Sequence, residues 1–167
     1  MDKALSRLAA SGTIRRLARG LYDYPRKHPE LGILSPDIEK VAQALAGKAR
    51  MRLQPAGAYA ANLLGLSEQV PAKVVFLTDA PSRTVKFQSG RQEIQLRRTT
   101  PRNMAAAGRL SGLLMQAFRH LGKERISPER MEHLSRTLPA RERRRLLKDL
   151  PLAPVWMHPL FRKLAGN

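Results

Sequence analysis

Apolar and polar positions near the start of the chain predict a short helix followed by a hairpin. Leu5 and Leu8 lie three residues apart and form the apolar edge of a helix expected over residues 2–11. Gly12 follows that segment, and glycine is a common residue just after a helix. Two short runs of β-prone residues then flank Ala18-Arg19-Gly20, a pattern that indicates a tight hairpin.

The middle of the chain predicts a small α/β unit. Residues 26–34 are polar and are predicted to be a linker, and Ser35-Pro36 opens a helix expected to run to Ala46. The continuous apolar run at 74–77 marks residues 73–78 as a strand. The remaining predicted elements are a strand at 51–53, a helix at 58–64 and a hairpin of residues 84–87 and 93–97 around Ser89-Gly90.

After residue 100 the pattern is helical throughout. The predicted helices cover residues 105–121, 127–138, 139–150 and 156–164. The chain is therefore predicted to have an α+β fold in three parts. These parts are a helix-and-hairpin segment at 1–27, a small α/β unit at 28–100 and an all-helical C-terminal region at 101–167.

The charge balance narrows the classes of partner. The 167 residues include 31 Lys and Arg against 13 Asp and Glu, a formal net charge of +18 at pH 7. Residues 1–27 hold 7 basic and 2 acidic residues, and residues 101–167 hold 14 and 5. Such an excess favours a polyanionic partner, bound by two separate surfaces or by one surface built from both ends of the chain.

The sequence offers little material for catalysis. It has no cysteine, which excludes disulfides, thiolate metal sites and cysteine nucleophiles. It lacks a phosphate-binding glycine loop, a dinucleotide fingerprint and a zinc-protease motif, and its 4 histidines are scattered. Because it also lacks a run of about 18 apolar residues and a secretory signal, we expect a cytoplasmic binding protein without catalysis, cofactor, metal or membrane segment.

Residues of the first segment are candidates for contact with DNA. Lys3 and Arg7 lie one helical turn apart, with Ser6 beside them, on a face that differs from the apolar edge. A short helix with an outward polar face and a following basic hairpin match the second half of a winged helix-turn-helix domain. There the helix enters the major groove, and the hairpin, or wing, contacts phosphates. The candidate wing residues are Arg15, Arg16 and Arg19.

A second basic cluster lies in the predicted helix at 139–150. Its members are Arg141, Arg143, Arg144, Arg145 and Lys148. Three of them share one helical face: Arg141, Arg145 and Lys148. The predicted buried side consists of Leu146, Leu147 and Leu150. Such a run is either a solvated face or, since few acids offset it, a contact with nucleic acid or an acidic partner. The possible second basic surface comprises Arg141, Arg144, Arg145 and Lys148.

Several stretches of the sequence resemble a known family. The run ALSRLAASGTIRRLARGLYDYP resembles the recognition helix and wing of AbiEi-type antitoxins, from type IV toxin–antitoxin systems. The resemblance continues through PAGAYAANLLGLSEQVPAKVVFLTDAPSRTVKF, LRRTTPRNM and DLPLAPVWMHPLF. It implies an N-terminal winged helix that represses its own operon, and a remaining region that counteracts a toxin of the nucleotidyltransferase type.

The resemblance also carries over to single positions. It places Lys3, Ser6 and Arg7 on the groove-facing helix and Arg15, Arg16 and Arg19 in the wing. Members of that family usually have about two more helices before the recognition helix, so we expect this chain to begin inside a partial winged-helix domain. A segment of about 25 residues is too small to fold alone. Either the start is truncated or alternative, or this piece packs on the α/β unit.

The predicted function is that of a cytoplasmic antitoxin that binds operator DNA as an autorepressor and counteracts a cognate nucleotidyltransferase-type toxin. A palindromic operator would imply a homodimer. One alternative is a basic module that binds structured RNA, mainly through residues 141–148. Another is an antitoxin that acts by protein contact alone, with its charge facing an acidic toxin surface and without specific DNA binding.

Overall fold

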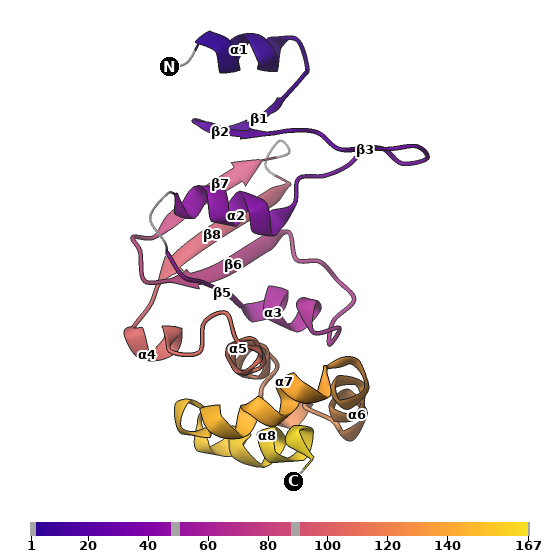
Figure 1. The fold of residues 1–167 in the computed structure, drawn as a ribbon, viewed down its shortest axis with the longest axis vertical. Helices are drawn as coiled ribbons and strands as arrows, with labels where there is room; N and C mark the ends of the chain where they lie inside the picture. The colour runs from indigo at the N-terminus through magenta and orange to yellow at the C-terminus, as the bar shows by residue number, and fades with distance from the viewer. Residues whose placement is uncertain (1–2, 48–50, 88–90, 167) are drawn as a thin grey trace.

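A four-stranded sheet lies at the centre of the chain in a computed structural model, which describes residues 3–47, 51–87 and 91–166 (Figure 1). Its strands are β5 (Leu53–Ala56), β6 (Lys73–Thr78), β7 (Arg83–Phe87) and β8 (Gln92–Arg98), in the order β5-β6-β8-β7. β6 and β8 run parallel, and the two outer strands pair antiparallel with them. The strand predicted at 73–78 is confirmed, because its unbroken apolar run suits a central strand.

The helix α2 (Ile38–Ala46) covers one face of this sheet (Figure 1). Four strand side chains in this core are at most 2% exposed: Val74, Phe76, Ile94 and Leu96. Tyr59 from α3 (Gly57–Leu63) adds its ring, with a centroid 5.5 Å from that of Phe76. Alternate positions of β6 and β8 therefore form one apolar layer beneath α2.

The N-terminal hairpin belongs to the same core. β1 (Arg15–Ala18) and β2 (Leu21–Asp23) pair antiparallel, as predicted. The turn between them contains Gly20, whose φ of +72° is rarely adopted by other residues. Leu17, Ala18 and Leu21 pack against the core beneath α2. The hairpin is thus attached to the α/β unit, and the predicted boundary at residue 27 does not separate two cores.

The helix α1 (Lys3–Ala10) precedes the hairpin at the N-terminal end of the molecule (Figure 1). None of these eight described residues is buried, and Leu5 and Leu8 are 36% and 41% exposed. The helix ends where the backbone N–H groups of Thr13 and Ile14 donate to the Leu8 carbonyl. The segment is therefore held to the rest of the chain by the hairpin, and α1 leaves its faces open to solvent.

After residue 100 the described part of the chain consists of helices joined by turns and contains no strand, in agreement with the predicted all-helical region. They form α4 (Pro101–Met104), α5 (Leu110–Leu121), η1 (Lys123–Arg125), α6 (Pro128–Thr137), α7 (Ala140–Arg145), η2 (Leu146–Leu152), η3 (Val155–Met157) and α8 (His158–Ala165), where η denotes a 3-10 helix. Phe118 and Phe161 are fully buried in this core, with ring centroids 6.4 Å apart. Ala60 and Ala61 of α3 pack into it as well. Because Tyr59 packs beneath α2, α3 joins both cores across the predicted boundary at residue 100.

One predicted helix begins five residues later than expected. A continuous helix was expected over 105–121, but α4 ends at Met104 and α5 begins at Leu110. Gly108, with a φ of +77°, turns the chain between them. This turn brings the Ala106 carbonyl against Gly112, where an added Cβ atom would lie 2.3 Å from the oxygen. Tertiary packing therefore interrupts a segment whose alanines favour a helix.

Other element ends also differ from the prediction. The N-cap of α2 is Asp37, not Ser35, because the Asp37 carboxylate accepts bonds from the N–H groups two and three residues later. α7 passes into η2 after Arg145, and Pro151 within η2 has no N–H to continue an α-helix. The predicted linker contains a short pair, β3 (Lys27–His28) and β4 (Gly32–Ile33).

Several further predictions hold with small shifts. The strand expected at 51–53 is β5, two residues later, and the helix expected at 58–64 is α3. β7 and β8 form the predicted antiparallel hairpin, whereas its turn at Ser89-Gly90 lies outside the described residues. Ser127 caps α6 as predicted, and the last predicted helix is divided between η3 and α8.

Candidate nucleic-acid interface

The polar face of α1 presents the three predicted helix residues to solvent. Lys3, Ser6 and Arg7 are exposed, and their side chains make no hydrogen bond or ion pair with the described residues. At 100° per residue they fall within roughly 100° of arc, opposite Leu5 and Leu8. The helix therefore carries a polar, cationic strip that other molecules can reach.

The hairpin divides its three arginines into two kinds. Arg15 faces Asp23 across the strands, and its guanidinium forms an ion pair with the Asp23 carboxylate and donates to the Leu34 carbonyl at 3.1 Å. Arg16 and Arg19 are exposed and have no such partner within the described residues. Arg15 thus stiffens the hairpin, while Arg16 and Arg19 remain available to an external anion.

The C-terminal cluster also contains one residue that serves the fold. Arg143 donates to the Leu164 carbonyl at 2.9 Å and is half-buried. Leu146 is buried as predicted, whereas Leu147 and Leu150 are half-buried. The other four cluster members line a hollow of about 340 Å³: Arg141, Arg144, Arg145 and Lys148. The structure therefore brings together the four residues predicted as a second basic surface.

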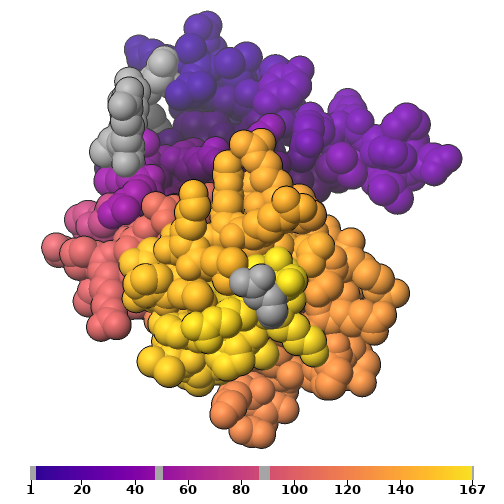
Figure 2. Space-filling model, turned by 60° about the horizontal axis from the view of Figure 1, so that its bottom comes forward, coloured from indigo at the N-terminus to yellow at the C-terminus, as the bar shows by residue number. Residues whose placement is uncertain are grey.

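The two basic surfaces lie toward opposite ends of the molecule. α1 and the β1–β2 hairpin lie at one end of its long axis, and α7 lies in the helical half at the other (Figure 1). When that helical end faces the viewer, the N-terminal segment lies behind it (Figure 2). Of the two arrangements that the charge distribution allowed, the structure has two separate surfaces.

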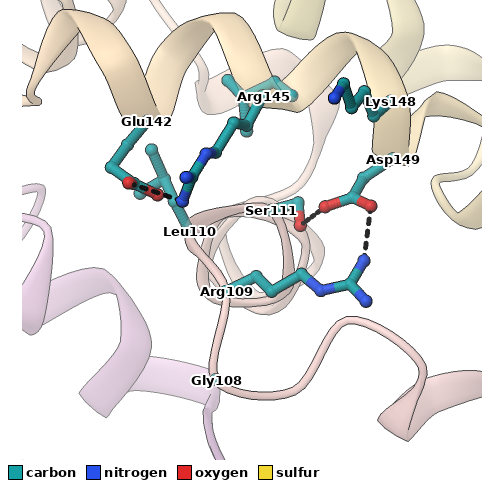
Figure 3. Close-up of a pocket in the computed structure, with 9 residues that line it drawn as sticks. Gly108, Arg109, Leu110, Ser111, Glu142, Arg145, Lys148 and Asp149 are labelled. Atoms are coloured by element: carbon teal, nitrogen blue, oxygen red, sulfur yellow. Dashed lines mark hydrogen bonds and ion pairs between the residues drawn. The ribbon is translucent and has the colours of Figure 1, made fainter.

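A cavity of about 320 Å³ adjoins the second basic surface and shares Arg145 and Lys148 with it. On its wall Asp149, only 8% exposed, accepts bonds from Ser111 Oγ at 2.5 Å and from Arg109 Nη1 at 2.6 Å (Figure 3). Ser111 lies in the first turn of α5, where a negative charge is favourable. Asp149 therefore ties η2 to the start of α5.

Another group of cations was not predicted from the sequence. Lys73, Arg97, Arg119 and His120 line a hollow of about 480 Å³ between the sheet and α5. Lys73 has an ion pair with Glu93 at 3.8 Å, and Arg119 donates to Asn103 at 3.3 Å. The alternation of side chains along the strands was the one sequence signal that Lys73 and Arg97 lie on the same face of the sheet. No pattern in the sequence predicts that these two residues lie close to Arg119 and His120 of α5.

The shifted pKa values belong to groups away from these surfaces. Burial, together with the charges of Glu39 and Asp37, raises the pKa of Tyr59 from 10.0 to about 12. A hydrogen bond from Ser127 lowers the pKa of Glu129. In the described part of the chain, no three His, Asp or Glu side chains converge where a metal ion could bind. No described helix has the length and hydropathy needed to cross a membrane.

Comparison with known proteins places the chain in a family but not in a functional class. No curated protein and no solved structure matches it. A family model does match residues 1–146, from α1 through the sheet to the start of η2. The matched stretch includes the whole N-terminal surface and most of the second basic surface. The chain therefore belongs to DUF6088, a family of unknown function.

Proposed function

We propose that the chain is a DNA-binding protein that contacts duplex DNA through α1 and the β1–β2 hairpin. The observation that carries this proposal is an exposed helix next to an exposed hairpin turn, each with cations that no described acid neutralises. Such cations can contact phosphates or base edges at the lowest energetic cost, because they lose no internal partner on binding. The anchored hairpin supplies a fixed platform for both elements.

In this proposal the segment acts as a partial winged helix. The major groove is about 12 Å wide and admits an α-helix with its side chains. Lys3, Ser6 and Arg7 would then face base edges, while Arg16 and Arg19 would neutralise phosphates and release counterions. The reaction is binding without turnover, and neither a cofactor nor a metal takes part.

The resemblance of the sequence to AbiEi-type antitoxins extends the proposal. The DNA bound is the operator of the protein's own operon, a homodimer binds it, and repression is the consequence. The same protein counteracts a nucleotidyltransferase-type toxin in the cytoplasm. In this proposal the C-terminal helical region counteracts the toxin, because the N-terminal segment is used for DNA.

Fluorescence anisotropy with three nucleic acids tests the DNA-binding proposal. The full chain is titrated against its own upstream DNA, a scrambled duplex and a folded tRNA, each across a salt series. We expect upstream DNA to bind about tenfold more tightly than the others, which is on the order of 1.4 kcal/mol. Equal affinities that fall together with salt would contradict specific operator binding.

A pair of double variants tests the assignment of the wing. Loss of two phosphate contacts in R16Q/R19Q should reduce the slope of log K against log salt by about 1.8. The matched control is R91Q/R98Q, which removes two arginines that are exposed and have no ion pair with the described residues. An equal effect of the two variants would mean that the contact is diffuse charge and not the wing.

Co-expression tests the antitoxin activity separately. The product of the neighbouring reading frame is induced in cells with and without this chain, and growth is followed. We expect the chain to restore growth when that product is toxic. A toxic neighbour whose effect the chain leaves unchanged would contradict the antitoxin proposal and leave DNA binding to stand alone.

A further inference from the structure

The face formed by α7 and the start of η2 is unusually rich in free cations. Arg141, Arg144 and Lys148 are exposed, and none of them has an ion pair within the described residues. Arg145 has one, with Glu142 at 3.1 Å. At 100° per residue the four cations lie within about 100° of arc, which explains why they line the same hollow of about 340 Å³.

The surrounding contacts keep this face cationic. Leu146 is buried in the helical core, which turns the four cations outward. Arg143 is held on the other side by the Leu164 carbonyl. Asp149, the nearest acid along η2, is bound by Ser111 and Arg109 and does not neutralise the face. The excess positive charge is therefore left for a ligand from outside.

The dimensions of the face fit a nucleic-acid backbone. From residue 141 to residue 148 the helix advances about 12 Å, at roughly 1.5 Å per residue in α7 and 2 Å in the 3-10 turn. Successive phosphates of one DNA strand rise about 3.4 Å along the axis and also rotate around it, which leaves them roughly 6–7 Å apart, so the face reaches two to three phosphates of one strand.

The residue composition of the hollow favours nucleic acid over protein as the partner. Its lining residues are all Lys or Arg, which contribute aliphatic stems as well as charged heads, whereas the centre of a protein interface is depleted of charged residues. Interfaces with nucleic acid are more polar and strongly positive.

We infer that the α7–η2 face is a second nucleic-acid surface, which binds phosphodiester backbone independently of α1 and the hairpin. Because the two surfaces lie toward opposite ends of the molecule (Figure 1), one chain can hold two nucleic-acid segments at once. This goes beyond the proposed operator binding, which uses the N-terminal surface alone. Duplex DNA and duplex RNA present the same phosphodiester chemistry to this face.

The test removes the N-terminal surface first, so that its own binding does not interfere. The background is the full chain carrying K3Q/R7Q/R16Q/R19Q. Into it are placed either the face variant R141Q/R144Q/K148Q or the matched control R91Q/R98Q/K123Q, which removes the same number and kind of exposed charges. All substituted residues of these two sets are exposed, and circular dichroism verifies that each protein folds. Anisotropy is then measured with a duplex DNA and a duplex RNA of one sequence.

The expected results differ by a large factor. With four cations on phosphate, the background chain should lose about 150-fold in affinity between 50 and 200 mM salt, a slope near −3.6. The face variant keeps one of the four cations, so its affinity should fall only about 3- to 4-fold over the same salt range. The control should behave like the background chain. Binding of DNA, RNA or both with this pattern supports the inference and identifies the nucleic acid.

Three results would overturn the inference. The background chain could bind neither duplex, the face variant could keep the salt slope of the control, or the control could lose as much as the face variant. None of these depends on whether α1 and the hairpin bind the operator, since that surface is already neutralised. Failure of the proposed function and failure of this inference are therefore distinguishable.

Discussion

Replacing Asp149 with alanine should destabilise the C-terminal half of the protein. Asp149 accepts from Ser111, which is 1% exposed, and from Arg109, whose side chain is 57% exposed. These bonds join η2 to the start of α5 across 38 and 40 positions of sequence. The substitution removes the carboxylate and leaves both donors behind.

The size of this loss of stability depends on whether each donor finds another acceptor once the carboxylate is gone. The Ser111 hydroxyl is buried and loses its acceptor, which costs about 1–3 kcal/mol. Arg109 turns to water, so its lost pairing costs about 0–1 kcal/mol. Removing a negative charge from the first turn of α5 costs about 0.3–1 kcal/mol more. Together these contributions predict a loss of about 1–5 kcal/mol in the free energy of unfolding.

Urea unfolding at pH 7 measures this loss by circular dichroism and by fluorescence of Trp156. That residue is the one tryptophan in the sequence, and it packs against the C-terminal core. In a thermal scan the same loss lowers Tm by on the order of 10 °C. The control is E142Q, which removes an acid from the exposed pair with Arg145 and should cost about 0–1 kcal/mol.

A double variant separates the buried hydroxyl from the other contributions. In D149A/S111A no unpaired hydroxyl remains, so the double variant should be more stable than the sum of the two single effects predicts, by about 1 kcal/mol. Additive single effects, or a loss in D149A no larger than in E142Q, would refute the role assigned to Asp149.

Other sites give predictions of their own. R15K should speed hydrogen exchange of the β1–β2 amides, because a lysine has one nitrogen in place of the two that Arg15 directs at the Asp23 carboxylate; unchanged rates would contradict this. G112A should lower stability by about 1–3 kcal/mol, since its Cβ would lie 2.3 Å from the Ala106 oxygen, and a raised Tm would count against that packing. The folded-state pKa of Tyr59 is raised from 10.0 to about 12, so its contribution to stability is intact below pH 10 and falls as pH rises toward 12. The stability of the wild type relative to Y59F should therefore fall between pH 10 and pH 12, and a constant free-energy difference would contradict the raised pKa of Tyr59.

Local pattern was sufficient for much of the fold. The strand at 73–78 was predicted to the residue, because a short continuous run of apolar residues is typical of a strand in the interior of a sheet. The β-prone runs on either side of Ala18-Arg19-Gly20 correctly predicted the hairpin, and Ser127 was correctly predicted to cap α6. These features depend on residues within a few positions of one another.

The break between α4 and α5 could not be read from the sequence. Residues 105–107 are alanines, which favour a helix, and the turn at Gly108 is set by the close approach of Ala106 and Gln54 to Gly112. The shared core of the hairpin and the α/β unit has the same origin. The break and the shared core both result from contacts between segments that are distant in the sequence, and local helix or strand propensity does not predict such contacts.

The sequence by itself determined where the positive charge lies along the chain and that a polyanion is the favoured partner. Tertiary structure decided which cations are free. Arg15 and Arg143 are held by Asp23 and the Leu164 carbonyl, while their neighbours Arg16 and Arg144 point to solvent. It also placed the two basic clusters toward opposite ends of the molecule. The physical reason is that a charge is neutralised by whatever the fold brings within a few ångströms, and that distance is unrelated to separation along the chain.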